Sequence, residues 1–119
     1  MLRLGTVPYL NAWPLLEGLT DAGTLRAEPP AALARSLSAG RYDAALVPVV
    51  ELLRNPRLRV VSGSAIATCG PVLSVVLLLR RAPHRLAQVV LDPHSATSQI
   101  LTRVLLAQSY GVEPEYRED

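Results

Sequence analysis

The chain has 119 residues and a formal net charge of +2; half of its residues are hydrophobic and 18% are charged. This composition is typical of one ordinary globular domain that can bury a core, and it excludes a disordered tail. All twelve basic residues are arginines, so the chain lacks the lysine that a Schiff base, a pyridoxal anchor or a phosphate-binding loop would need.

The first half of the chain alternates short apolar runs with helical patterns. Pro30 fits the first turn of a helix, Gly40 ends that helix, and Pro48 ends a strand because proline cannot continue a central ladder. The expected elements, in chain order, are a strand at 2–7, a short helix at 12–19, a helix at 29–40, a buried strand at 42–50, a helical turn or two at 50–55 and a strand at 58–63.

The second half predicts a long buried strand at 71–79, because the run "PVLSVVLLL" is continuous in apolar residues, as when both faces of a strand are covered. This run is far shorter than the roughly 20 residues that span a bilayer. A strand at 88–92, a helix at 95–111 capped by Gly111, and a weak strand or frayed end at 113–119 follow. Strands that alternate with helices predict an α/β fold with a largely parallel sheet.

Three stretches follow predicted strands and carry polar or aromatic residues, at 8–13, 48–51 and 92–98. Ligands of open α/β sheets bind in the crevice outside the carboxyl ends of the strands. We therefore expect these three stretches to converge on one edge of the sheet.

The hydroxyl-rich stretch "DPHSATSQ" carries the strongest chemical signal. Ser95, Thr97 and Ser98 precede a predicted helix, whose free first-turn amides and positive dipole end would bind a carboxylate or another anion. Ordinary capping by Ser95 explains the same pattern equally well, although Ser98 stands where a capping box has Glu or Gln.

Asn11 and its aromatic neighbours form a second candidate site. Asn11 could hydrogen-bond a ligand or cap the helix that follows, and the residues alone slightly favour the cap. Tyr9 and Trp13 could line a pocket or belong to the edge of the core. Ser74 could act as a nucleophile, but no serine-hydrolase motif supplies a base, so a bond to its own backbone neighbourhood is the simpler interpretation.

The single cysteine, Cys69, excludes an intrachain disulfide, and with only two histidines beside it we expect no structural zinc site. We expect Cys69 to be a small buried residue. Scattered arginines and five aromatic residues give only a weak indication of nucleic-acid binding, and we expect neither a nucleic-acid nor a membrane partner. The N-terminus lacks the features of a signal peptide, so we expect a cytoplasmic location.

Four stretches, "VPYLNAWPL", "YDAALVPVVELLR", "VVSGSAIATCGPVLSVVLL" and "VVLDPHSATSQILTRVLL", stand in an order and spacing that resemble one family. That family is the chorismate dehydratases of menaquinone biosynthesis, the MqnA family of the futalosine route. The resemblance covers nearly the whole chain. Its Y-L-N-x-x-P-L and L-D-P-H-S-A-T-S elements are fairly specific when they occur together.

The resemblance implies a fold like that of the type II periplasmic binding proteins, with two α/β lobes and a ligand cleft. It also implies the dehydration of chorismate to 3-[(1-carboxyvinyl)oxy]benzoate without a metal or organic cofactor, with a substrate carboxylate as the hypothetical proton acceptor. The implied catalytic residues are Asn11 and Ser74, and the implied substrate-binding residues are Tyr9, Pro48, Val49, Ser95, Thr97 and Ser98.

Members of this family are longer, so the resemblance implies a truncated lobe. Residues 1–82 would form the N-terminal segment of lobe 1, and residues 83–119 the crossover and the start of lobe 2. A half-built cleft would expose apolar sheet surface, so we expect a homo-oligomer and little or no chorismate dehydration by the chain alone. Two other classes stay open: a non-catalytic intracellular lobe that binds a carboxylate, and an interaction domain without a ligand.

Overall fold

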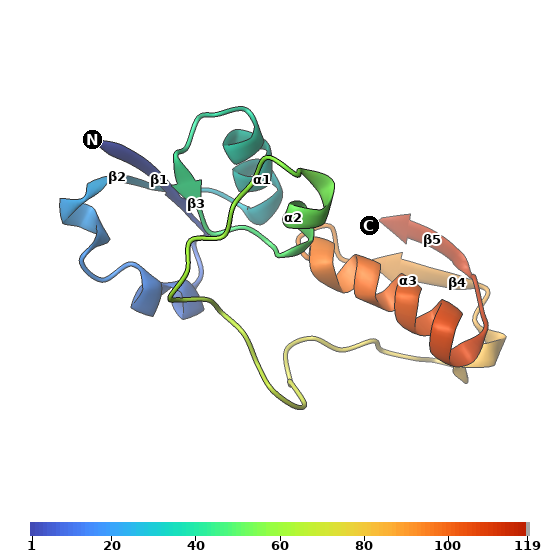
Figure 1. The fold of residues 1–119 in the computed structure, drawn as a ribbon. Helices are drawn as coiled ribbons and strands as arrows, with labels where there is room; N and C mark the ends of the chain where they lie inside the picture. Colours follow the sequence, from blue (N-terminus) through green and yellow to red (C-terminus); the bar gives the residue numbers. More distant parts are fainter. Residues whose placement is uncertain (119) are drawn as a thin grey trace. The chain divides into compact units, whose positions relative to one another are not determined.

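The computed structural model describes residues 1–118 and divides into two compact units, Met1–Ala67 and Thr68–Asp119. Each unit carries its own parallel sheet with helices beside it (Figure 1), so the predicted α/β class with a mostly parallel sheet is confirmed. The assignment of residues 1–82 and 83–119 to two lobes stays a prediction.

The first unit is built on a three-stranded parallel sheet of order β2-β1-β3 (Figure 1). The central strand pairs Leu2 with Gly23 on one side and Leu4 with Ala44 on the other. Because the three strands are parallel, their carboxyl ends lie at the same edge of the sheet. The elements of this unit are β1 (Leu2–Thr6), the 3₁₀ helices η1 (Leu10–Leu15) and η2 (Leu19–Asp21), β2 (Gly23–Ala27), α1 (Pro30–Ser38), β3 (Ala44–Ala45) and α2 (Val50–Arg54).

Helix α1 packs closely on the central strand. It starts at Pro30, where a missing amide costs little, and it buries Leu33 completely against Val7, Ala12 and Tyr42. A Cβ at Gly5 would lie 2.5 Å from the Leu33 Cδ1 atom, so any larger residue at this position would force the buried Leu33 side chain to move. The core of this unit therefore centres on the contact between α1 and β1.

A polar network ties the end of β2 to α1 and to the segment before β3. The half-buried Glu28 carboxylate accepts hydrogen bonds from the Tyr42 hydroxyl at 2.6 Å and the Ser36 hydroxyl at 2.7 Å. Arg41 donates to the same Ser36 oxygen at 2.7 Å. The bonds from Tyr42 and Ser36 lower the pKa of Glu28, and the bond to Glu28 raises the pKa of Tyr42. The network satisfies a fully buried hydroxyl, Ser36, that would otherwise destabilise the core.

An ion pair joins β1 to the residue before β3. The Arg3 guanidinium donates to Asp43 Oδ1 at 2.7 Å and to Oδ2 at 3.2 Å, and the Arg3 backbone amide donates to Oδ2 at 2.7 Å. These bonds lower the pKa of Asp43 from 3.8 to about 2. Both side chains are partly exposed, so solvent screening keeps the stabilisation modest.

The Asp43 pair predicts a specific acid dependence of stability. A carboxylate whose pKa is depressed in the folded state stabilises it above the unfolded pKa and loses that contribution as the pH falls through the folded value. We therefore expect the free energy of unfolding of the wild type to exceed that of Asp43→Asn by a constant amount above about pH 5, and this difference to shrink as the pH falls toward 2. Urea titrations followed by circular dichroism would measure it. Glu17→Gln, which replaces an exposed carboxylate, is the matched control; a difference independent of pH would contradict the prediction.

The second unit is a strand–helix–strand arrangement. Its elements are the 3₁₀ turn η3 (Pro83–Arg85), β4 (Gln88–Leu91), α3 (Ala96–Tyr110) and β5 (Glu115–Glu118), with β4 and β5 parallel. Helix α3 packs against the two strands (Figure 1) and buries Leu106 with Val89 and Leu91. Gly111 ends the helix with φ at 63°, and its amide bonds the Ala107 carbonyl, which confirms the predicted cap.

Several predicted elements are wrong in type or length. The helix expected at 12–19 is the pair of 3₁₀ turns η1 and η2, and the strand expected at 42–50 is paired only at Ala44–Ala45. The strands expected at 58–63 and 71–79 are not formed, because residues 59–81 make no backbone hydrogen bond to another segment within residues 1–118. Strand β2 was not predicted, since its half-exposed sequence GTLRA carries no strong apolar pattern. Asp119, in the predicted end segment, lies outside the described residues.

Candidate functional site

Two of the predicted stretches begin at the carboxyl edge of the first sheet. Residues 8–13 follow β1 and residues 48–51 follow β3, and these two strands are parallel neighbours. Residues 92–98 instead follow β4, which belongs to the second sheet. The expectation that all three stretches meet at one sheet edge is therefore wrong for the third, because the chain starts a new sheet before it.

Asn11 is an exposed residue inside the 3₁₀ helix η1, so it is not the cap of that helix. The cap position is Tyr9, and no side chain bonds the free amides there. The neighbouring Ala12 is fully buried and fixes the turn to the core, while Tyr9 and Trp13 are 44% and 68% exposed. An amide group and two aromatic rings are thus exposed on a short turn that the buried Ala12 anchors.

Pro48 and Val49 follow β3 at the same edge of the first sheet. The chain leaves β3 at Ala45 and turns into α2, where the Pro48 carbonyl accepts the Glu51 amide at 3.0 Å and the Val49 carbonyl accepts the Leu52 amide at 3.1 Å. Each of these carbonyls already accepts one hydrogen bond. The Val49 side chain, which is 65% exposed, adds apolar surface at this edge.

The hydroxyl-rich stretch lies at the start of α3 in the second unit. Ser95 occupies the N-cap position, yet its hydroxyl makes no capping bond and instead donates to the Ser98 hydroxyl at 2.6 Å. The first amide bonded within the helix is that of Gln99, to the Ser95 carbonyl at 3.0 Å. The backbone amides of the first turn, which precede Gln99, have no hydrogen-bond acceptor within the helix. Together with the Thr97 side chain they lie at the start of this 15-residue helix, where its dipole is positive. Of the two interpretations of this stretch, simple capping by Ser95 is wrong.

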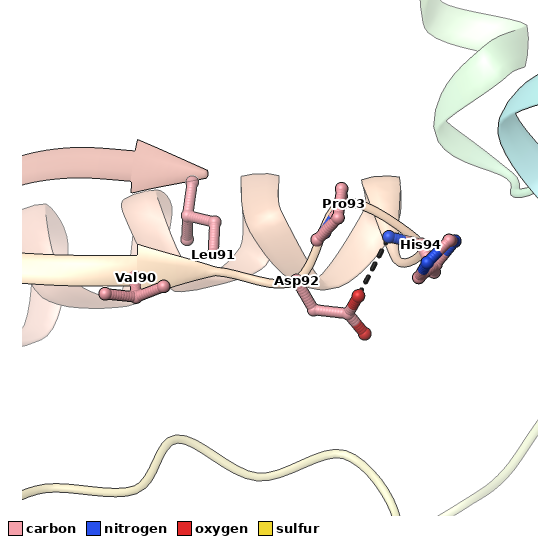
Figure 2. Close-up of a pocket in the computed structure, with 5 residues that line it drawn as sticks. All are labelled: Val90, Leu91, Asp92, Pro93 and His94. Carbon is pink, nitrogen blue, oxygen red and sulfur yellow. Dashed lines mark hydrogen bonds between the residues drawn. The ribbon is translucent and has the colours of Figure 1, made fainter. Parts of the chain in front are cut away.

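The loop that leads into α3 is shaped by Asp92. Its carboxylate accepts the His94 amide at 2.8 Å, as Figure 2 shows, and its carbonyl accepts the Gln99 side-chain amide at 2.9 Å. The same residues, Val90 to His94, line a shallow open hollow beside the end of β4 (Figure 2). Sequence reasoning missed the ordering roles of Asp92 and Gln99, although an aspartate two residues before an amide it can bond is a known turn signal.

Ser74 has no structural partner in the described chain. It is exposed in an irregular segment, and no hydrogen bond to its hydroxyl is present among residues 1–118. The predicted strand around it is absent, so its proposed place in a cleft lacks support from the local fold. Cys69, expected to be buried, is also exposed, because the apolar run that would have covered it does not join a sheet.

The predicted site residues therefore fall into two groups. Tyr9, Asn11, Pro48 and Val49 lie at the carboxyl edge of the first sheet, and Ser95, Thr97 and Ser98 lie at the start of α3. Their roles toward a substrate stay predictions. Chemically, the first group offers an amide and apolar contacts, whereas the second offers hydroxyls and free amides for an anion.

Residues 1–118 contain neither a metal-binding cluster nor a membrane-spanning helix. No group of three His, Cys, Asp or Glu side chains in this range is arranged to hold a metal ion. No helix there combines the length and the apolar character needed to cross a bilayer.

Comparison with known families gives a match that spans almost the full sequence. The family model described as menaquinone biosynthesis matches residues 2–119. The match includes both groups of predicted site residues and every element described above.

Proposed function

The chain belongs to the menaquinone biosynthesis family, and from this premise we propose that its reaction is the dehydration of chorismate to 3-[(1-carboxyvinyl)oxy]benzoate. The family match supports a role in menaquinone biosynthesis. The Y-L-N-x-x-P-L and L-D-P-H-S-A-T-S elements support the choice of this reaction within it. We also propose that the chain contributes to a lobe of the type II periplasmic-binding-protein kind and acts in the cytoplasm.

The observation that carries the proposal is the start of α3. Chorismate is a dicarboxylate, and its enzyme must bind at least one carboxylate firmly in order to orient the ring. Thr97 and Ser98 supply hydroxyls there, the first-turn amides have no helical acceptor, and Ser95 does not block them by capping. A carboxylate at a helix start gains typically 0.3–1 kcal/mol from the dipole, in addition to its hydrogen bonds.

The chemistry needs little beyond binding and proton transfer. Removing the proton from the ether-bearing ring carbon and expelling the neighbouring hydroxyl as water makes the ring aromatic, which drives the reaction forward. Asn11 is a poor base, so its proposed role is to orient the substrate or to stabilise developing charge. Ser74 is proposed as a second hydroxyl, Tyr9, Pro48 and Val49 as pocket lining, and a carboxylate of chorismate itself as the proton acceptor.

A second candidate function is a non-catalytic lobe that binds a carboxylate. It rests on the start of α3, where hydroxyls and first-turn amides would bind a carboxylate whether or not turnover follows. This function differs from the first only in the absence of turnover.

One experiment tests these functions, in which the chain is titrated with chorismate and the products are analysed by mass spectrometry. We expect saturable binding of chorismate, little or no turnover by the chain alone, and any turnover to yield a product lighter by one water. Binding with turnover would establish the dehydratase, and binding without turnover would establish the carboxylate site that both functions share. Absence of both would contradict both proposals. Shikimate, a related ring acid with one carboxylate, is the matched control ligand and is expected to bind more weakly.

A further inference from the structure

The segment Leu73–Leu79, called here the apolar segment, is unusually exposed for its composition. Leu73 is 98% exposed, Leu78 is 87% exposed and Val76 is 63% exposed. The sequence LSVVLLL has high strand propensity, no charge and no proline. Residues of this kind are stable in water only when they are covered, so the segment needs a partner surface.

The backbone of the apolar segment also lacks partners. It lies within residues 59–81, to which the structure gives no backbone hydrogen bond with another segment. Leu77 nevertheless packs against the Val89, Leu91 and Leu106 cluster, so the segment is anchored to the second unit. The chain bends at residues 73–75 and is irregular at 76–79, so strand addition would straighten an anchored segment whose amides and carbonyls are free to pair with the edge of a sheet.

Strand β5 offers a free edge with complementary charge. The second sheet contains β4 and β5 in the described residues, and β5 is paired only with β4. Glu118 is the last residue of β5 and Glu113 lies two residues before the strand. Both are exposed, and neither forms an ion pair among residues 1–118. The apolar segment is followed directly by Arg80 and Arg81, which are exposed and equally unpaired in that range.

We propose that the apolar segment of one copy of this chain adds as a strand to the free edge of β5 in a second copy, with Arg80 and Arg81 beside its glutamates. The charges favour this pairing over the simplest alternatives. Pairing of two β5 edges would bring glutamates of the two copies together. Parallel pairing of two apolar segments would bring their arginines together. Both arrangements place like charges side by side and are repulsive. A reciprocal exchange between two copies forms a closed dimer with two such contacts. The inference is independent of the proposed reaction.

The test measures the mass of the 119-residue chain by analytical ultracentrifugation over a range of concentrations. We expect a monomer–dimer equilibrium in the wild type. Leu73→Asp with Leu78→Asp should leave a monomer, and because both leucines are exposed, circular dichroism should show an unchanged fold. Arg80→Glu with Arg81→Glu, and separately Glu113→Arg with Glu118→Arg, should each weaken the dimer by about tenfold or more.

The decisive arm mixes the two charge-reversed variants. Each is impaired alone, but in a heterodimer both contacts again bring opposite charges together, one of them with the signs exchanged, so a heterodimer should form more tightly than either homodimer. A wild type that stays monomeric at every concentration would overturn the proposal. So would a dimer that survives the two aspartates, or a mixture that gains no affinity, since either would mean that association uses another surface.

Discussion

Truncating Leu33 to alanine is expected to lower the free energy of unfolding of the first unit by about 2–5 kcal/mol, the range for buried leucines. Leu33 is fully buried between Val7, Ala12 and Tyr42. Its Cδ1 atom lies against the backbone of Gly5, which has no side chain to move into the space that alanine would leave. The cavity should therefore stay largely open, which places the cost toward the upper part of the range.

The fluorescence of Trp13 can report the loss of stability in Leu33→Ala for the first unit alone. It is the one tryptophan of the chain and lies in η1, next to the buried Ala12. Urea unfolding followed by its fluorescence should shift to lower denaturant for Leu33→Ala. Leu53→Ala is the matched control, because Leu53 is 84% exposed in α2 and should change stability by less than about 0.5 kcal/mol. Equal midpoints for the two variants would show that α1 is not docked on β1 as described.

Where local signals and tertiary structure agree, the fold was predictable from the sequence. Pro30 and Gly111 mark the ends of α1 and α3 because each fits only one end of a helix. The strand at Gln88–Leu91 is short, β-branched and followed by a strong helix, which is the pattern of a parallel crossover. These elements are specified mainly by residues that are close in the sequence.

The wrong predictions concern strands that form only by pairing with a strand far away in the sequence. GTLRA becomes β2 because the backbone of β1 lies beside it, although its own pattern is weak. LSVVLLL has the stronger pattern but pairs with no other segment, so propensity alone does not make it a strand. The same dependence separates the predicted site into two groups, since the division into two sheets leaves no local mark in the sequence.

The candidate site was predictable in its chemistry but not in its bonding. The hydroxyls of Ser95, Thr97 and Ser98 were found from their place before a helix, but two interpretations fitted them equally. The structure decides against capping because the Ser95 hydroxyl bonds Ser98 at 2.6 Å, a choice of rotamer that sequence does not reveal. Likewise, Asn11 could be excluded as a cap only once Tyr9 was found at the start of η1.

Removing the hydroxyls at the start of α3 is expected to weaken chorismate binding by about two orders of magnitude, under the function proposed above. Hydrogen bonds to a charged group contribute about 1.5–3 kcal/mol each, and every 1.4 kcal/mol changes affinity tenfold. Thr97→Val with Ser98→Ala removes two such donors while it keeps the helix and its first-turn amides. Some affinity should remain for that reason, because the amides and the dipole still attract a carboxylate.

Isothermal titration calorimetry of Thr97→Val with Ser98→Ala would test whether the start of α3 binds the carboxylate, with a control variant in the same helix. Thr102→Val with Ser109→Ala makes the same chemical changes farther along α3, away from its start, and should bind chorismate like the wild type. Asn11→Ala, in the first unit, should weaken binding less than the double variant if Asn11 only orients the ring. Wild-type affinity in Thr97→Val with Ser98→Ala would remove the start of α3 as the carboxylate site. If Asn11→Ala then abolished binding, the edge of the first sheet alone would hold the ligand.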